Sequence, residues 1–191
     1  MRPVRKILLV LVFVLTACGS RDAGAGGNTP AAPAAPPAPE APTGTSAAGP
    51  TVADKPECTA ADIKVAGKFG AKPEVTIPDT CAPPTKLVIK DLSAGSGKKA
   101  AKGSTVQTNY LLVTWSDKQV LDNSFDRGQP FPIEDLGHAQ VIDGWNKGMI
   151  GIKEGGRRLL IIPPDLGYGP GGNGIQPNET LVFVVDAVKV T

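Results

Sequence analysis

Apolar residues are distributed very unevenly along this chain of 191 residues. Residues 7–15 form an unbroken apolar run, whereas residues 19–56 contain a single large apolar residue, Val52. Beyond that segment, short apolar runs alternate with polar positions and turn residues. Alternation with a period of two predicts β-strands, and a spacing of three to four predicts a helix. The pattern therefore predicts a leader, a spacer and one folded domain. Their boundaries are 1–17, 18–56 and 57–191.

Five segments of the folded domain have the composition of β-strands and are bounded by turn signals. The longest begins with strict alternation of polar and apolar residues. Another ends just before Pro163, because proline cannot continue a hydrogen-bonded ladder. The predicted strands are Glu74–Ile77, Lys86–Leu92, Thr105–Trp115, Arg157–Ile162 and Thr180–Val190.

Only one helix is predicted, and it is short. Trp145 and Met149 would share one face at a spacing of four residues. We expect Asp143 to cap its start and Gly151 to end it. One short helix beside several antiparallel strands predicts the α+β class, with an antiparallel β-sheet wrapped around that helix.

The leader has the features of a bacterial lipoprotein signal peptide. Arg2, Arg5 and Lys6 precede the apolar run. As a helix, that run would rise about 14 Å, under half of a ~30 Å hydrocarbon core, so it indicates a secretory signal rather than a membrane span. Leu15–Cys18 resembles a lipobox, which implies cleavage before Cys18 and lipid on its thiol. The chain would then be anchored to the outer face of the cytoplasmic membrane. An ordinary signal peptide with an incidental cysteine is the alternative.

The spacer has a strongly biased composition. Ala, Pro, Gly, Ser and Thr account for 31 of the 38 residues from 19 to 56. Such a segment cannot bury enough apolar surface to offset the entropy lost on ordering. We therefore expect residues 18–56 to be a lipid-anchored, disordered tether.

Two cysteines remain once Cys18 is assigned to the lipid. In an exported protein, the isolated pair Cys58 and Cys81 favours a disulfide. A metal site would need more ligands than the chain's one histidine, His138, would add. The disulfide would pin an N-terminal extension, residues 57–84, to the domain that follows.

Charge and motifs exclude several classes of function. The net charge is +2, and without the three basic residues of the leader it is −1, so no strongly basic face is expected for nucleic acid. His138 falls in a predicted exposed turn. Gly169–Gly174 matches the GxGxxG pattern, but Pro177 follows and no helix opens where a pyrophosphate would need one. We expect no catalytic nucleophile, no cofactor, no metal and no nucleic-acid partner.

Four stretches of the chain together resemble one known family. They are Val120–Phe131, Gln140–Gly148, Ile162–Gly169 and Ile175–Phe183. In this order and at this spacing they resemble the FKBP-type peptidyl-prolyl cis/trans isomerases, over about residues 85–191. The extension around Gly67–Pro78 is similar to one in secreted actinobacterial members.

The resemblance implies a shallow apolar cleft between the sheet and the helix. It implies that the catalytic residues are Tyr110, Asp122 and Tyr168. It implies that the substrate-binding residues are Leu121, Phe131, Val141, Ile142, Trp145, Ile175 and Phe183. We expect Asp122 to orient the site by bonding Tyr110, and we expect the Ile142 N–H and the Tyr168 hydroxyl to hold the substrate carbonyl.

These residue types suit rotation about an X–Pro peptide bond. The barrier to this rotation, ~18–20 kcal/mol, comes from the loss of amide resonance as the bond twists. The twisted amide is also less dipolar than the planar one. An apolar cleft therefore disfavours the ground state more than the transition state. The expected function is X–Pro isomerisation in unfolded or partly folded exported proteins, by a monomer that macrolides of the family inhibit. A catalytically weak binding module or holdase is the alternative, because Leu121 stands where the family usually has an aromatic residue.

Overall fold

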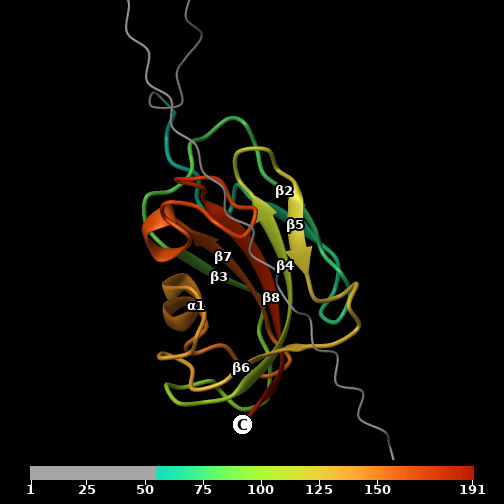
Figure 1. Cartoon of the computed structure of the whole chain (residues 1–191). Coiled ribbons are helices and arrows are strands. Elements are labelled where there is room, and N and C mark those ends of the chain that lie inside the picture. The colour runs from blue at the N-terminus through green and yellow to red at the C-terminus, as the bar shows by residue number, and fades with distance from the viewer. Residues whose placement is uncertain (1–54) are drawn as a thin grey trace, which may run out of the picture. The chain divides into compact units, whose positions relative to one another are not determined.

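The main sheet has six strands, and every pairing in it is antiparallel (Figure 1). The structure is a computed structural model, and it describes residues 55–191. Cys18, the leader and almost all of the predicted tether lie outside these residues. The spatial order of the sheet is β3 (Val88–Ser93), β7 (Arg157–Ile162), β8 (Leu181–Val190), β4 (Val106–Thr114) and β5 (Val120–Asn123), and β6 (Phe131–Ile133) also pairs with β4.

Residues 55–191 contain one α-helix, α1 (Asp143–Gly148), which lies against one face of this sheet (Figure 1). The predicted α+β class, with an antiparallel sheet and one short helix, is confirmed. The predicted helix boundaries are wrong at both ends. Ile142, whose backbone is extended, is the N-cap, and Asp143 is the first helical residue; no side chain caps this terminus. The helix stops at Gly148, and the positive φ of Gly151 belongs to the turn that follows.

Five strands lie where the apolar pattern placed them, within one or two residues at each end, and β7 matches its predicted range. Three short strands were not predicted. They are β1 (Lys64–Ala66), β5 and β6. Each is three or four residues long and mostly exposed, so it has no apolar run to mark it.

The two faces of the main sheet bury two separate apolar clusters, as the alternation of side chains along a strand requires. On the helix side, Leu112 and Leu160 pack with Trp145 of α1. On the opposite side, Leu111 and Leu159 pack against residues of the N-terminal extension. The sheet is therefore covered on both faces, which explains why its central strands are apolar on both sides.

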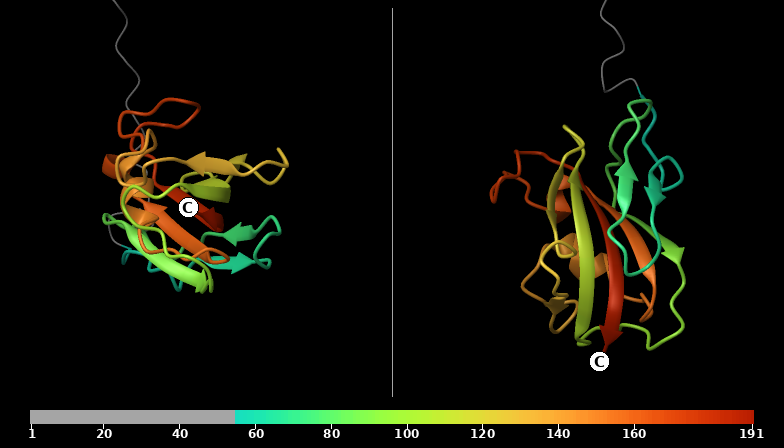
Figure 2. Two further views of the ribbon diagram at one scale, coloured as in Figure 1. Left: turned by 90° about the horizontal axis from the view of Figure 1, so that it is seen from below. Right: turned by 90° about the vertical axis from the view of Figure 1, so that its right-hand side faces the viewer.

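The extension forms its own two-stranded antiparallel sheet, β1 with β2 (Glu74–Thr76). This sheet lies on the opposite side of the main sheet from α1 (Figure 2). The predicted disulfide between Cys58 and Cys81 is confirmed. The prediction that it pins the extension to the following domain is wrong, because both cysteines lie within the extension and the bond closes the extension on itself. Burial of Ile63 and Ile77 against the main sheet holds the extension in place instead.

A buried ion pair joins the extension to the sheet. Arg157 on β7 donates to both carboxylate oxygens of Asp186 on β8, at 2.6 and 2.8 Å, and both side chains are almost fully buried. The same guanidinium donates to the carbonyls of Gly67 and Ala71, while the Gly70 N–H donates to Asp186. The turn between β1 and β2 therefore supplies the partners that these buried charges need.

Within residues 55–191, no helix is long and apolar enough to cross a membrane. The same residues contain no group of three or more side chains suited to holding a metal ion.

Candidate active site

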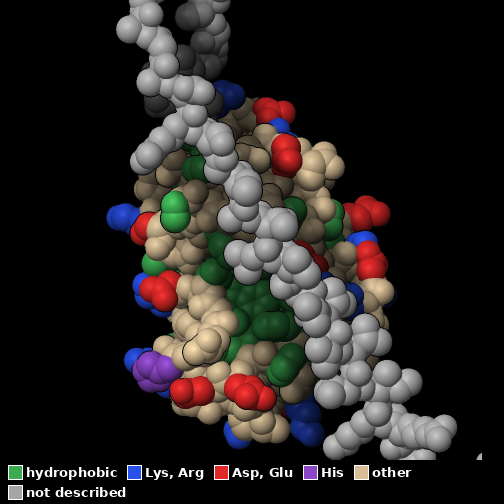
Figure 3. Space-filling view, viewed as in Figure 1, with side chains coloured by type: hydrophobic (Ala, Val, Ile, Leu, Met, Phe, Trp, Pro, Cys, Tyr) green, Lys and Arg blue, Asp and Glu red, His purple; other side chains and the backbone are tan. Residues whose placement is uncertain are grey.

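A cleft of about 240 Å³ opens between α1 and the strands of the sheet's helix-facing side. Figure 3 shows apolar side chains gathered in a hollow on this face of the molecule. The cleft contains eight of the ten residues that the resemblance implied for catalysis and substrate binding. They are Tyr110, Asp122, Phe131, Val141, Ile142, Trp145, Tyr168 and Phe183.

Aromatic rings set edge to face form the floor and walls. The Trp145 ring lies 5.3 Å from the Tyr110 ring at 86° and 5.2 Å from the Phe183 ring at 80°, between centroids. Phe131 adds a fourth ring, 5.9 Å from Tyr110. Each ring edge meets a ring face, which is a favoured geometry for aromatic pairs. The rings therefore hold one another in fixed orientations around an apolar surface.

The indole nitrogen of Trp145 is buried and has no hydrogen-bond partner within the described residues. A buried donor without a partner costs about 1–3 kcal/mol of stability. The floor of the cleft is therefore a place where the protein gives up some stability.

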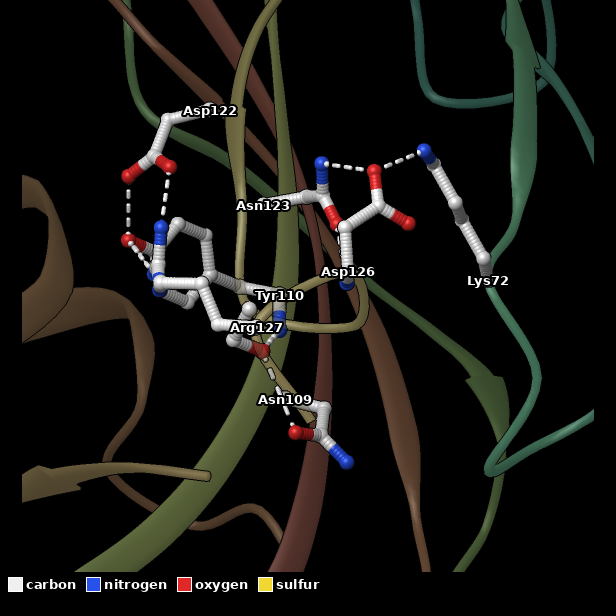
Figure 4. A network of polar contacts seen from close by, with 8 residues as sticks. Lys72, Asn109, Tyr110, Asp122, Asn123, Asp126 and Arg127 are labelled. Atoms are coloured by element: carbon white, nitrogen blue, oxygen red, sulfur yellow. Dashed lines mark hydrogen bonds and ion pairs between the residues drawn. The ribbon is translucent and has the colours of Figure 1, made fainter. Parts of the chain in front are cut away.

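Tyr110 also belongs to a polar trio with Asp122 and Arg127, whose contacts Figure 4 shows. The Tyr110 hydroxyl donates to Asp122, and the Arg127 guanidinium donates to the Tyr110 oxygen at 2.7 Å while pairing with Asp122. The guanidinium also lies over the Tyr110 ring, 5.4 Å from its centroid. The expected bond between Tyr110 and Asp122 is therefore present, and Arg127 extends it into a closed triangle.

The trio sets the charge state of each member. Partial burial favours a raised pKa for Asp122, but the hydrogen bonds from Tyr110 and Arg127 outweigh it and lower this pKa below its usual value. Burial, reinforced by the hydrogen bond to Asp122, raises the pKa of the Tyr110 hydroxyl. At neutral pH Asp122 is therefore an anion and Tyr110 is neutral. This arrangement orients groups and does not supply a proton.

Backbone contacts fix the trio to the sheet. Ser124, which is fully buried, accepts a hydrogen bond from the Tyr110 N–H at 2.9 Å and donates to Asn109 at 3.1 Å. Its own N–H donates to the Tyr110 carbonyl. The loop that follows β5 is thereby bound to β4, and this places Arg127 over Tyr110.

Asn146 on α1 holds the loop that forms the opposite lip. Its side-chain oxygen accepts from the N–H groups of Gly137 and Ala139 at 3.0 Å, and its amide nitrogen donates to the Ala139 carbonyl at 2.9 Å. This loop leads into Val141 and Ile142. The Ile142 N–H donates no hydrogen bond within residues 55–191, so it is free to serve a ligand carbonyl.

The helix lies unusually close to β7. A Cβ atom on Gly144 would stand 2.4 Å from Ile162 Cγ2, and one on Gly148 would stand 2.8 Å from Leu160 Cδ2. Arg158 on β7 donates to the Gly148 carbonyl at 2.7 Å and so satisfies the end of the helix. These contacts set the depth at which Trp145 lies in the cleft.

Two of the implied residues do not line the cleft. Leu121 is 39% exposed and is the extra residue of a β-bulge, because Leu112 pairs with Asp122 and Val113 with Val120. Ile175 is 6% exposed and belongs to the buried cluster on the helix side of the sheet. Residue-by-residue transfer of the motif could not foresee the bulge.

Three residues of the site were not identified from the sequence. Leu112 and Gln140 line the cleft, and Arg127 completes the polar trio. Alternation along the predicted strand could have placed Leu112 beside Tyr110, since the two are two positions apart and so share a face. Arg127 had no local signal, because its role depends on how the loop after β5 folds.

Sheet, helix and cleft together define an α+β protein with an aromatic-lined cleft between one short helix and an antiparallel sheet. Comparison with known proteins identifies the family. The family model described as FKBP-type peptidyl-prolyl cis-trans isomerase matches residues 96–188. The chain is 48% identical, over 122 residues, to the "FK506-binding protein" of Streptomyces anulatus. That match covers 62% of this chain and 97% of the relative. The chain belongs to the FKBP-type peptidyl-prolyl cis-trans isomerase family.

Longer proteins share the same domain. The chain is 43% identical, over 107 residues, to the "FKBP-type peptidyl-prolyl cis-trans isomerase FkpA" of Escherichia coli, a match that covers 56% of this chain and 38% of the relative. The crystal structure of FkpA superposes with a TM-score of 0.51 at 42% identity, covering 56% of this chain and 49% of that one. The predicted fold, family and enzyme class are confirmed.

Proposed function

We propose that this prolyl isomerase is exported from a bacterial cell and held by lipid on Cys18 at the outer face of the cytoplasmic membrane. There it accelerates X–Pro rotation in unfolded or partly folded exported proteins. The observation that carries the catalytic part is the aromatic cleft around Trp145, bordered by the trio of Tyr110, Asp122 and Arg127. The lipobox-like Leu15–Cys18 and the biased composition of residues 18–56 support the anchor and the tether.

The proposed mechanism uses desolvation and orientation. The substrate proline lies against the Trp145 ring, where the planar amide loses more hydration than the less dipolar twisted amide. The free Ile142 N–H, with the Tyr168 hydroxyl, holds the substrate carbonyl while the bond turns. A 10⁵-fold acceleration needs about 7 kcal/mol, which desolvation and one or two hydrogen bonds can supply. Asp122 acts as a positioning residue, because it contacts Tyr110 and Arg127 and remains ionised.

A macrolide ligand is proposed to compete for this cleft. Relatives in Streptomyces anulatus and Neisseria meningitidis carry the name FK506-binding protein. In this chain five aromatic residues line the cleft, and Leu121 adds no ring to them; the five are Tyr110, Phe131, Trp145, Tyr168 and Phe183. We propose that the protein acts as a monomer, since one chain supplies the whole cleft.

Proline-limited refolding tests the activity. The exported chain carrying Cys18→Ser, with its disulfide formed, is added to a protein whose slow refolding phase is X–Pro isomerisation. We expect the slow phase to accelerate in proportion to enzyme, and FK506 to abolish the acceleration. A folded, oxidised chain that binds the substrate without accelerating it would instead support the binding module or holdase.

Cell fractionation tests the anchor. The natural chain is expected in the membrane fraction and to be degraded by protease added to cells without their wall. The Cys18→Ser variant is expected to leave the membrane fraction, while a Cys58→Ser variant remains there as a matched control. Equal membrane association of the natural chain and Cys18→Ser would contradict lipid anchoring.

A further inference from the structure

A second hollow, of about 530 Å³, lies at the end of the main sheet, where the extension meets two loops of the isomerase domain. The extension contributes Pro78, Cys81 and Pro83, the turn after β4 contributes Trp115, and the segment before β8 contributes Pro177. We call this hollow the Trp115 groove. Three prolines and a tryptophan give it a rigid, largely apolar wall.

The charged groups around the Trp115 groove already satisfy one another. Lys118 pairs with Asp79, and the Lys55 ammonium donates to the Asp79 carbonyl at 2.7 Å. The Glu179 carboxylate accepts from the Ser116 N–H at 2.9 Å and from its hydroxyl at 2.6 Å. A charged ligand would have to displace these bonds. A neutral ligand would not.

Trp115 contributes an indole N–H to this wall, beside the side-chain amides of Gln176 and Asn178. Its ring is half-buried and packs against the apolar cluster on the extension side of the sheet. Tryptophan beside proline rings is the kind of surface on which extended, proline-containing segments dock, with the indole N–H donating to a ligand carbonyl.

The groove lies beyond the ends of β4 and β8, the two adjacent strands that contribute Leu112 and Phe183 to the catalytic cleft. Leu112 on β4 and Phe183 on β8 are paired and line the cleft. Trp115 and Thr180 line the groove, and the Trp115 N–H donates to the Thr180 carbonyl at 3.0 Å. Trp115 lies three residues beyond Leu112 and Thr180 lies three residues before Phe183, an odd spacing that directs side chains to opposite faces of the sheet. The cleft faces α1, whereas Trp115 packs on the extension side, so a client that contacts both sites must pass around the end of the sheet. A flanking segment of eight extended residues reaches about 26–29 Å.

We propose that the Trp115 groove is an extended subsite for the client polypeptide. It binds a neutral, extended, proline-containing segment that flanks the X–Pro bond held in the cleft. This inference rests on the proposed function, since the cleft must hold the same client. The N-terminal extension thereby gains a role in recognition, because Pro78, Cys81 and Pro83 form one wall of the groove.

The chain's two tryptophans make the inference directly testable, since Trp145 lies in the cleft and Trp115 in the groove. The indole N–H resonances of the exported Cys18→Ser chain are followed by NMR, with Trp115→Phe to assign them. One peptide has four residues and a single Leu-Pro bond. Two others add eight residues with further prolines, one before and one after that bond. Gly/Ser extensions of equal length serve as controls.

We expect the short peptide to shift only Trp145 and one of the proline-containing long peptides to shift both resonances. A long peptide that shifts Trp145 alone would overturn the groove as a subsite. A shift of Trp115 alone would overturn the shared client. If no peptide shifts Trp145, the proposed function of the cleft fails, and this result is distinct from failure of the groove.

Kinetics give a second test with Trp115→Ala and Trp115→Phe. For a long proline-containing substrate we expect Trp115→Ala to raise KM about tenfold, the effect of losing one aromatic anchor, with kcat unchanged. Turnover of the four-residue substrate should stay at the natural value, which shows that the cleft is intact. Trp115→Phe keeps the packing and loses the N–H, so its KM for the long substrate should lie between those of the natural chain and Trp115→Ala. Equal KM values for the natural chain and both variants would overturn the proposal.

Discussion

The Tyr110 hydroxyl donates a hydrogen bond to the Asp122 carboxylate, which joins adjacent strands β4 and β5 at the edge of the cleft. Arg127 closes the triangle by contacting both. The bond therefore does two things: it holds the Tyr110 ring upright beside Trp145, and it keeps the Asp122 charge satisfied. Both effects are consequences of one geometry, and each can be tested separately.

Replacing Asp122 with leucine removes the acceptor that orients Tyr110. We expect isomerisation to fall at least tenfold, equivalent to about 1.4 kcal/mol of transition-state stabilisation, while the fold is retained. Asp122→Asn keeps an acceptor without the charge and should lose less. Glu134→Leu, at an exposed carboxylate outside the cleft, is the matched control. Unchanged turnover in Asp122→Leu would remove this residue from the mechanism.

The pKa of Asp122 is lower in the folded protein than in the unfolded chain, where it is near 4. The ionised Asp122 therefore stabilises the fold fully above the unfolded-state pKa, and this stabilisation is lost as the pH falls through the folded-state pKa. The pKa of Tyr110 is raised, so its contribution is present below about 10 and is lost at higher pH. We therefore expect isomerisation to be constant between about pH 5 and 9. In Arg127→Met the loss of isomerisation at low pH should occur at a higher pH, because the guanidinium helps to lower the Asp122 pKa. This loss is the acid limb of the pH profile. An unchanged acid limb would contradict this coupling.

Adding one methyl group to α1 should disturb the cleft. Alanine favours a helix over glycine by about 1 kcal/mol. At Gly144, however, the new Cβ would lie 2.4 Å from Ile162, in a packed core. We expect Gly144→Ala to destabilise the domain by about 1–3 kcal/mol and to lower turnover, since Trp145 moves with the helix. Urea unfolding measures the first effect. Lys147→Ala, on the exposed face, should be neutral.

The pair between Arg157 and Asp186, in which both side chains are buried, should be far more sensitive than the pair between the buried Arg158 and the exposed Asp91, because Arg158 also donates to the carbonyls of Gly148 and Ile150. Asp186→Asn leaves a buried guanidinium without its anion and should cost about 3–5 kcal/mol in the free energy of unfolding. Asp91→Asn, whose carboxylate is 53% exposed, should cost under about 1 kcal/mol. Equal losses in urea unfolding would show that the extension does not depend on this pair.

Removing the disulfide should lower the stability of the fold while leaving isomerase turnover largely unchanged. In the chain-entropy model, closing the loop between Cys58 and Cys81 contributes roughly 3–3.5 kcal/mol. We expect the double serine variant to lose about that amount in thermal and urea unfolding. Turnover of a four-residue substrate should persist below its melting temperature, because neither cysteine lines the cleft. A large loss of that turnover in the folded variant would contradict this separation.

The central strands were predictable because each carries its own signal. β4, β7 and β8 are buried, so their apolar residues are contiguous in the sequence. β5 and β6 lack this signal, since they are short and largely exposed and form by pairing with β4. The start of α1 was misplaced for a related reason. Asp143 is a frequent capping residue type, but here the extended backbone of Ile142 begins the helix without a side-chain cap.

Sequence alone determined the fold class, the disulfide, the aromatic residues of the cleft and the bond between Tyr110 and Asp122, because apolar periodicity, cysteine count and motif spacing are local or directly transferable properties. Only the tertiary structure decided that Arg127 completes the trio, that the bulge moves Leu121 out of the cleft, and that Trp115 forms a second groove with the extension. These are relationships between segments far apart in the chain. Pairing, bulges and packing set them, and no single segment encodes them.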